Sequence, residues 1–159
     1  MTIFAFDASH SLGRVRAVDT RRVNIQVDKD EELRKARVGQ LVALRLPGAI
    51  EEWLIGIIES VMKSPMLEEV TDGGTPAEID GTSELITPGE SVLNTVRLTL
   101  VGRVFLDRDT KPCFSRSLFQ VPEIDCPCNV LRDAQLQTFM NLLSVESKTT
   151  HSLEMGHYT

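Results

Sequence analysis

The chain has 159 residues, a length that suits one ordinary domain built around a single hydrophobic core. Hydrophobic residues make up 42% of the sequence and charged residues 25%, a balance that disfavours both a disordered chain and a membrane protein. The formal net charge of -6 argues at first against nucleic-acid binding, because proteins that bind DNA or RNA usually carry a basic excess.

The excess of acid belongs to one segment, residues 64–95. That segment carries seven of the 23 acidic residues and none of the 17 basic ones, so the rest of the chain is close to neutral. It also holds three prolines and four glycines, and it offers too little apolar surface to offset the entropy of ordering it. We therefore expect a mobile, acidic inserted loop, and the net charge says little against a DNA-associated protein.

No sequence signal directs the chain to a membrane. The longest apolar run, residues 53–58, is far shorter than the ~20 residues needed to span a bilayer, and the N-terminus lacks the basic start of a signal peptide. The three cysteines, Cys113, Cys126 and Cys128, are an odd number in a chain long enough to fold without disulfides. These features predict reduced thiols, a cytoplasmic location and no membrane partner.

The first predicted elements are an N-terminal arm over residues 1–12 and a β-hairpin over residues 13–28. Apolar and polar side chains alternate on both sides of Asp19-Thr20-Arg21, which is typical of two strands with one buried face. The residues assigned to that face are Val15, Ala17, Val23, Ile25 and Val27. The charge-dense stretch 28–37 is expected to form an exposed loop or a short helical turn, and residues 41–46 a third strand.

Two longer strands are predicted next. Residues 53–61 are apolar on both faces, so both sides of this strand should be covered, and Gly56 indicates a bulge or a close backbone approach. Residues 96–106 alternate along their whole length, and a strand this long is expected to bend at Gly102.

The remaining elements complete a mostly-β fold. A short strand is predicted over residues 114–119, a helix over about 132–144 from apolar side chains spaced at i, i+3, i+4 and i+7, and a final strand over 152–158. The sequence therefore predicts a small six- or seven-stranded β-barrel over residues 13–159, with one C-terminal helix.

No motif predicts an active site. Lys63-Ser64 and Lys148-Thr149 lack the glycines of a phosphate-binding P-loop, so no nucleotide-binding residue is assigned. Cys126-Pro127-Cys128 lacks the spacing and the further ligands of a zinc site, and buried thiols near a turn are favoured. The three histidines, at positions 10, 151 and 157, show no catalytic arrangement. The chain is expected to bind no metal or cofactor and to be no enzyme.

Two features of the surface invite a functional interpretation, and each has a plainer alternative. Arg14, Arg16, Arg21 and Arg22 cluster in the first hairpin. They could contact phosphate, or they could lie on a solvated outer strand face, which is favoured because no aromatic residues are interleaved with them. Trp53, the only tryptophan, could anchor a partner or fill the core at one end of the barrel.

In order and spacing, several segments resemble the N-terminal β-barrel domain of HerA-like hexameric DNA translocases. This domain, the HAS barrel, is similar in fold to the N-terminal barrels of rotary ATP synthase subunits. The segments are Gly13-Arg14-Val15, Val38-Gly39-Gln40-Leu41-Val42, Leu54-Ile55-Gly56-Ile57-Ile58, Val96-Arg97-Leu98-Thr99-Leu100-Val101-Gly102, Phe114-Ser115-Arg116 with Pro122, and Leu153-Glu154-Met155-Gly156. The sequence departs from the family at Ser117, where a glycine commonly follows the arginine, and in the length of its acidic insert.

The resemblance implies a non-catalytic domain of a longer ATPase. In that family an ATPase core, which would bind ATP and magnesium and engage DNA, follows the barrel, and we expect this chain to lack it. The barrels form part of a hexamer and dock an effector, such as a NurA-like nuclease in DNA repair or a sirtuin-like or nuclease effector in antiphage defence. Trp53, Ile55, Ile57, Arg14 and Arg16 are the interface candidates, because an apolar outer face of the 53–61 strand would suit a neighbour or effector.

Two other functions stay open at this point. One is a small OB-like barrel that binds single-stranded nucleic acid through Arg14 and Arg16. The other is a self-standing enzyme that uses Cys126 or Cys128.

Overall fold

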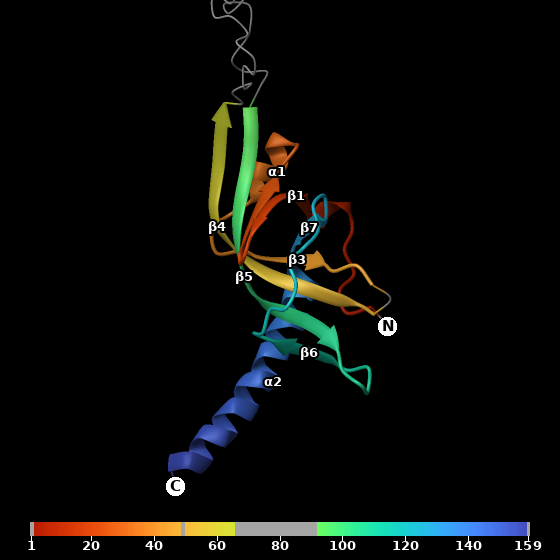
Figure 1. Ribbon diagram of the computed structural model, residues 1–159, viewed down its shortest axis with the longest axis vertical. Coiled ribbons are helices and arrows are strands. Elements are labelled where there is room, and N and C mark those ends of the chain that lie inside the picture. The colour runs from red at the N-terminus through yellow and green to blue at the C-terminus, as the bar shows by residue number, and fades with distance from the viewer. Residues whose placement is uncertain (1, 49, 66–91, 159) are drawn as a thin grey trace, which may run out of the picture.

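The computed structural model describes residues 2–48, 50–65 and 92–158, with side chains as far as residue 146, and its described part is mostly β (Figure 1). Its strands are β1 (Ser11–Asp19), β2 (Arg22–Gln26), β3 (Leu41–Arg45), β4 (Glu52–Pro65), β5 (Val92–Leu106), β6 (Pro112–Ser115) and β7 (Pro127–Val130). Its helices are the 3-10 turn η1 (Ala8–His10), α1 (Asp30–Lys35) and α2 (Asp133–Tyr158).

The strands form a closed antiparallel barrel with one extra strand. The order β2-β1-β7-β3-β4-β5-β6, together with a β2–β5 pairing, joins six strands into a ring and leaves β6 outside it. The predicted mostly-β barrel with a C-terminal helix is therefore confirmed. The hairpin, the strand at 41–46 and the short helical turn are confirmed as β1–β2, β3 and α1.

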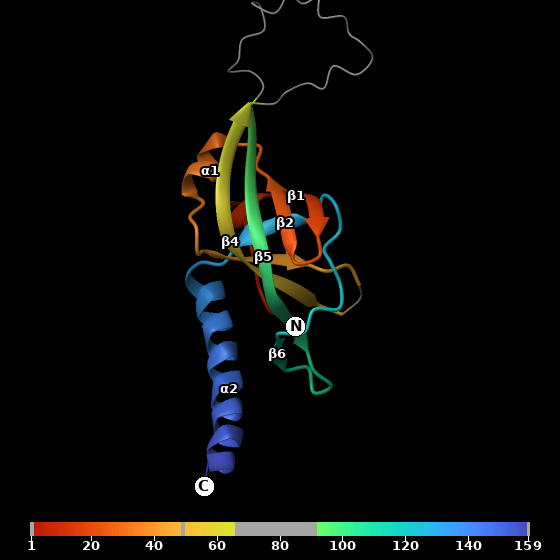
Figure 2. The same cartoon turned by 60° about the vertical axis from the view of Figure 1, so that its left-hand side comes forward.

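Two bulges bend the long β4–β5 ribbon. Val101 is an extra residue on β5 opposite the step from Ile55 to Gly56, and Glu59 is an extra residue on β4. The first half of β5 pairs with β2 inside the ring, whereas the second half leaves the ring and pairs with β6. Figure 2 shows this curvature in β5, as predicted for the region of Gly102.

Side chains of the barrel strands fill the interior. Fully buried residues from three different strands include Val23, Leu54 and Leu98, and α1 closes one end through Leu33. Alternation along β5 is regular, since every second residue from Asn94 to Val104 is buried. The interior is therefore a packed core of apolar side chains, in the manner of small barrels.

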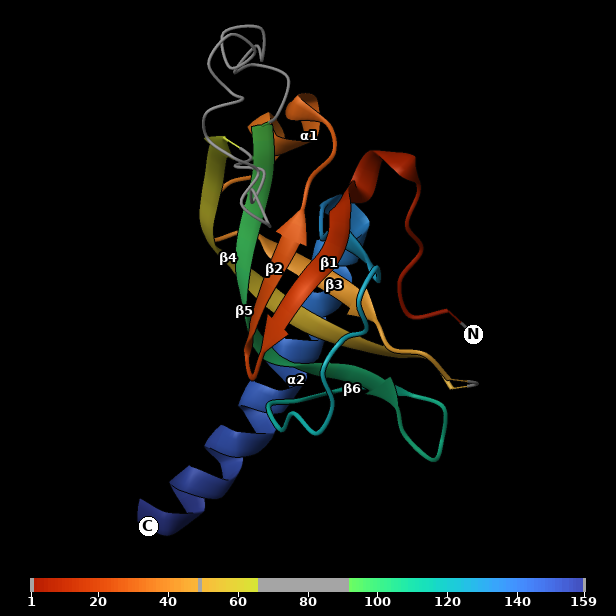
Figure 3. The same ribbon diagram turned by 45° about the horizontal axis from the view of Figure 1, so that its top comes forward.

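A second core lies on the outer face of β3, β4 and β5. The N-terminal arm contributes Ile3 and Phe4 to it, and α2 contributes Phe139. Figure 3 shows the arm and α2 running outside the strands. The prediction that both faces of the 53–61 strand are covered is confirmed for its first half, and the cover is supplied by the chain itself.

Several sequence predictions were wrong in detail. The final strand at 152–158 is helical, because α2 continues to Tyr158, well beyond the predicted end at 144. The strand β7 was missed, and the strand at 114–119 ends at Ser115. Strands β4 and β5 extend to Pro65 and from Val92, so both ends of the predicted acidic loop are strand; residues 66–91 lie outside the described part.

The predicted inward face of β1 also needs one correction. A register shift between Val15 and Ala17 inserts Arg16 as a bulge, and beyond it Val18 is the residue that packs against the core. Ala17 is consequently exposed, not buried. A bulge shifts strict period-2 alternation by one residue, which the sequence pattern alone does not reveal.

Candidate docking surfaces

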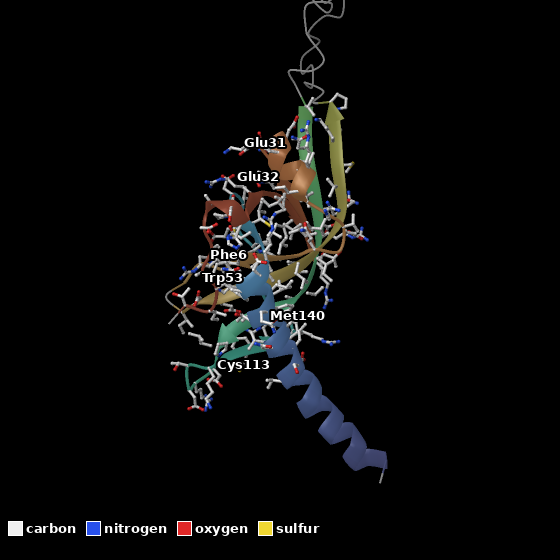
Figure 4. All side chains as sticks on the ribbon, turned by 180° about the vertical axis from the view of Figure 1, so that it is seen from behind. Phe6, Glu31, Glu32, Trp53, Cys113 and Met140 are labelled. Atoms are coloured by element: carbon white, nitrogen blue, oxygen red, sulfur yellow. The ribbon has the colours of Figure 1, made fainter. Side chains whose placement is uncertain are left out.

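Trp53 lies in the second core. Its side chain is 6% exposed, and the rings of Phe4 and Phe6 meet it edge-on with centroids 5.7 and 5.2 Å away. Figure 4 shows Phe6 and Trp53 next to each other at the arm. Of the two alternatives for Trp53, the core position is the one found, and a partner could reach it only by displacing the arm.

A buried carboxylate fastens the arm over Trp53. Glu51 is 8% exposed; its Oε1 accepts a hydrogen bond from Trp53 Nε1 at 3.0 Å, and its Oε2 accepts one from the backbone N–H of Ile3 at 2.6 Å. Both oxygens are therefore satisfied, as a buried carboxylate requires. We call this pair of hydrogen bonds the Glu51 latch.

Further contacts fasten the arm to the first turns of α2. His10 Nε2 lies 3.1 Å from Gln135 Oε1, and Gln135 Nε2 donates to the backbone oxygen of Ala5. Arg132 Nη1 donates to the backbone oxygen of Ser9 at 3.3 Å. The arm and α2 are thus fastened to each other over the outer face of the barrel strand β4.

The other β4 candidates differ in their accessibility. Ile55 is completely buried in the second core. Ile57 is half-buried and belongs to neither core; its cross-strand neighbours are Leu41 on β3 and Thr99 on β5. Of the three apolar candidates, only Ile57 offers surface to a partner.

Arg14 and Arg16 are exposed on β1 and lie apart from the second core. Arg14 Nη1 donates to the backbone oxygen of Asp125 at 3.3 Å. Nearby, Arg22 and Arg97 contribute to a hollow of about 160 Å³ on the outer face of the barrel, lined also by Ala17, Val18, Asp19 and Asn24. Arg22 lies 4.0 Å from Glu59, a weak surface pair. The structure does not bring these arginines together with Trp53 or Ile55.

A larger groove lies where the loop before β3 meets the start of α2. It has a volume of about 580 Å³ and is lined by Arg37, Val38, Gly39, Gln40, Leu41, Leu131, Arg132, Asp133 and Leu136. We call it the α2–β3 groove. No local sequence pattern reveals this groove, because its two sides are about 90 residues apart in the chain and each side alone resembles an ordinary amphipathic segment.

The cysteines are free thiols in protected positions. Cys128 is completely buried and Cys126 nearly so, and Cys126 Sγ donates to the backbone oxygen of Arg45 at 3.3 Å. Burial raises the pKa of all three thiols, including that of Cys113. A nucleophilic thiol needs the opposite shift, so these environments do not favour thiol catalysis.

The described residues contain neither a metal-binding cluster nor a helix suited to span a membrane. No group of three or more His, Cys, Asp or Glu side chains in that part of the chain is placed to hold a metal ion. Among the described helices, none is long and apolar enough to span a membrane.

No family model matches the chain, and no curated protein matches it.

Proposed function

We propose that this chain is an oligomerisation and effector-docking barrel, the N-terminal part of a HerA-like DNA translocase, and that it performs no chemistry itself. The observation that carries the proposal is the closed six-stranded barrel. Its strands contain three of the six segments on which the resemblance to the HAS barrel rests, which are Gly13-Arg14-Val15 on β1, residues 54–58 on β4 and Val96–Gly102 on β5, and β3 contains the end of a fourth.

Two features expected from the resemblance differ in the structure. The apolar outer face of the first half of β4 is covered by the chain's own arm and helix, so it no longer argues for a neighbour. The segment Leu153-Glu154-Met155-Gly156 is helical, so it does not resemble a family strand. The proposal therefore depends on the barrel segments and on the surface outside the second core.

That surface offers exposed apolar side chains on separate loops. Val38 is 67% exposed, Ile50 70% and Phe119 76%. Single exposed apolar side chains are normal on protein surfaces, so these residues support docking only where one of them continues into a larger apolar surface.

Size-exclusion chromatography with light scattering tests the proposal. We expect the chain joined to a HerA-like ATPase core to assemble into a hexamer, and a NurA-like nuclease or a sirtuin-like effector to co-elute with it. A barrel that remains monomeric with the core attached and binds neither effector would contradict the proposal.

A second candidate function is binding of single-stranded nucleic acid. The observation that favours it is the hollow between Arg22 and Arg97, which lies on the same outer face as Arg14. Binding to phosphate would weaken steeply with salt and would decrease in the Arg22→Ala and Arg97→Ala variants. Absence of binding to an oligonucleotide at low salt would exclude this function.

A further inference from the structure

We infer that the α2–β3 groove binds a peptide segment of a partner protein in which a large apolar side chain is flanked by carboxylates. This inference rests on the proposed docking function and gives it a location and a partner chemistry. It is drawn from the exposure, the charges and the backbone support of the groove.

The groove has an apolar floor and an exposed apolar wall. Leu131 is 3% exposed at the bottom, and the half-buried side chains of Leu41 and Leu136 pack against the second core from above it. Val38, on the loop before β3, is 67% exposed. An apolar side chain that filled the groove would cover Val38 and both leucines, and removal of this apolar surface from water would favour binding.

The apolar surface continues beyond the groove along the outer face of the barrel. Leu41 is directly opposite Ile57 in the β3–β4 register, and directly opposed side chains lie about 5 Å apart. Ile57 is half-buried and packs in neither core. A segment longer than one residue could therefore rest along the row from Leu136 to Ile57.

Two guanidinium groups flank the apolar floor. The side chain of Arg37 makes no hydrogen bond or ion pair within the described part of the chain, and Arg132 donates only to the backbone oxygen of Ser9. Asp133 supplies the single carboxylate of the lining, so the groove is positive overall. Guanidinium groups bind carboxylates through paired hydrogen bonds, which favours acidic residues beside the apolar one.

The backbone holds the groove in shape before a partner arrives. On the β4 side, the N–H of Gly39 donates to the oxygen of Ile58 at 2.9 Å, and the N–H of Ile58 donates to the oxygen of Gln40 at 2.9 Å. On the α2 side, the N–H of Leu131 donates to the oxygen of Leu41 at 2.9 Å. Because the groove is already ordered, its binding to a partner costs less conformational entropy.

The combination of apolar floor and charged rim selects a protein segment over a nucleic acid. A phosphate backbone could meet Arg37 and Arg132, but it would leave Val38 and the leucines in contact with water. A peptide with an apolar side chain between acidic ones satisfies both requirements.

Selection from a random peptide library on the immobilised chain tests the inference without assuming a sequence. We expect enriched peptides to carry a large apolar residue beside Asp or Glu. Labelled copies of these peptides, measured by fluorescence polarisation, should bind the Val38→Glu and Arg37→Glu variants at least about tenfold more weakly. Val121→Glu and Arg108→Glu, which place the same changes at exposed positions outside the groove, should leave the affinity unchanged. Circular dichroism confirms that each variant is folded.

Each other outcome overturns the inference. Failure to enrich any peptide, enrichment of peptides without acidic residues, or equal binding to Val38→Glu and the unmodified chain would each show that the groove lacks this specificity. Loss of self-assembly in Val38→Glu, with peptide binding intact, would show that a second copy of the chain occupies the groove.

The same variants separate this inference from the proposed function. If an effector still co-elutes with Val38→Glu as well as with the unmodified chain, the docking function holds and the groove is not its site. If peptides bind the groove but no effector or assembly is found, the docking function fails and the groove inference stands.

Discussion

The barrel interior and the second core are built in different ways. Six strands close around the interior by main-chain hydrogen bonds, and its side chains come from all of them. The second core joins the arm, one sheet face and α2 by packing of side chains such as Phe4, Trp53 and Phe139, and the Glu51 latch adds two hydrogen bonds at the arm. Because the arm and α2 contribute no strand to the ring, we expect this region to open locally while the barrel stays folded.

Truncation of a barrel side chain should have the largest effect. Leu98 is completely buried on β5 at the centre of the interior. The Leu98→Ala variant should lose about 2–5 kcal/mol of unfolding free energy, because it leaves a cavity that closed strands cannot fill. Urea denaturation measures this loss. Met62→Ala on β4, where the side chain is 45% exposed, is the control and should change stability little. Equal losses of unfolding free energy in both variants would contradict the assignment of Leu98 to the barrel interior.

Gly102 joins the two regions, and its replacement should have the next largest effect. A Cβ there would lie 2.5 Å from the Phe114 ring and 2.6 Å from the Ser115 oxygen. Phe114 in turn packs edge-on against Phe139 of α2, with ring centroids 5.3 Å apart. Gly102→Ala should therefore displace β6 and cost up to about 3 kcal/mol in urea denaturation. At Gly56 the nearest atom is 3.3 Å away, so Gly56→Ala should cost clearly less; the reverse order would refute this account.

Removal of the Glu51 latch should loosen the N-terminal arm without unfolding the barrel. Glu51→Ala leaves the N–H groups of Ile3 and Trp53 without an acceptor, at a cost of about 1–2 kcal/mol. Hydrogen exchange should become faster in the arm, and Trp53 fluorescence should shift towards that of an exposed indole, while exchange in β1 and β2 stays slow. Glu59→Ala, which removes an exposed carboxylate on β4 away from the arm, should change neither signal. Faster exchange throughout the barrel would show that the two regions unfold together.

The difference between the barrel interior and the second core also explains how far the sequence could predict the fold. Barrel strands have one apolar face, so alternation at Val23, Ile25 and Val27 was sufficient to place them. The strand β7 has only four residues and begins at Pro127, too short for a period to be recognised. Residues 152–158 carry no strong helical period, so their sequence does not reveal that α2 continues to Tyr158.

The candidate sites were harder to predict because they depend on contacts between distant segments. The arm reaches Glu51 across 48 residues of sequence, so the pattern of the 53–61 strand showed that a cover exists but not that the chain supplies it. The α2–β3 groove likewise needs Leu41 and Leu136 to meet. Local spacing assigns a face to each leucine, and only the fold brings the two faces together.

The smallest expected effect is a pH dependence on the barrel side of the molecule. Asp30 accepts hydrogen bonds from Asn94 Nδ2 at 2.7 Å and from Lys63 Nζ at 3.1 Å, which hold α1 against the β4–β5 ribbon. The Asn94 hydrogen bond and the Lys63 charge keep the pKa of Asp30 below its usual value. The stabilisation is therefore complete above the usual carboxyl range and is lost as the pH falls through the lowered pKa.

Asp30→Asn should remove this contribution to the pH dependence while changing the second core little. Thermal unfolding of the variant and of the unmodified chain, followed from neutral to acid pH, should show a difference at neutral pH that shrinks on acidification. Asp28→Asn is the matched control, since Asp28 is exposed and makes no hydrogen bond within the described residues. The effect should be small because half of the Asp30 side chain is exposed to solvent, which screens its interaction with Lys63. A difference that persisted at acid pH would mean that the carboxylate charge is not what holds α1 in place.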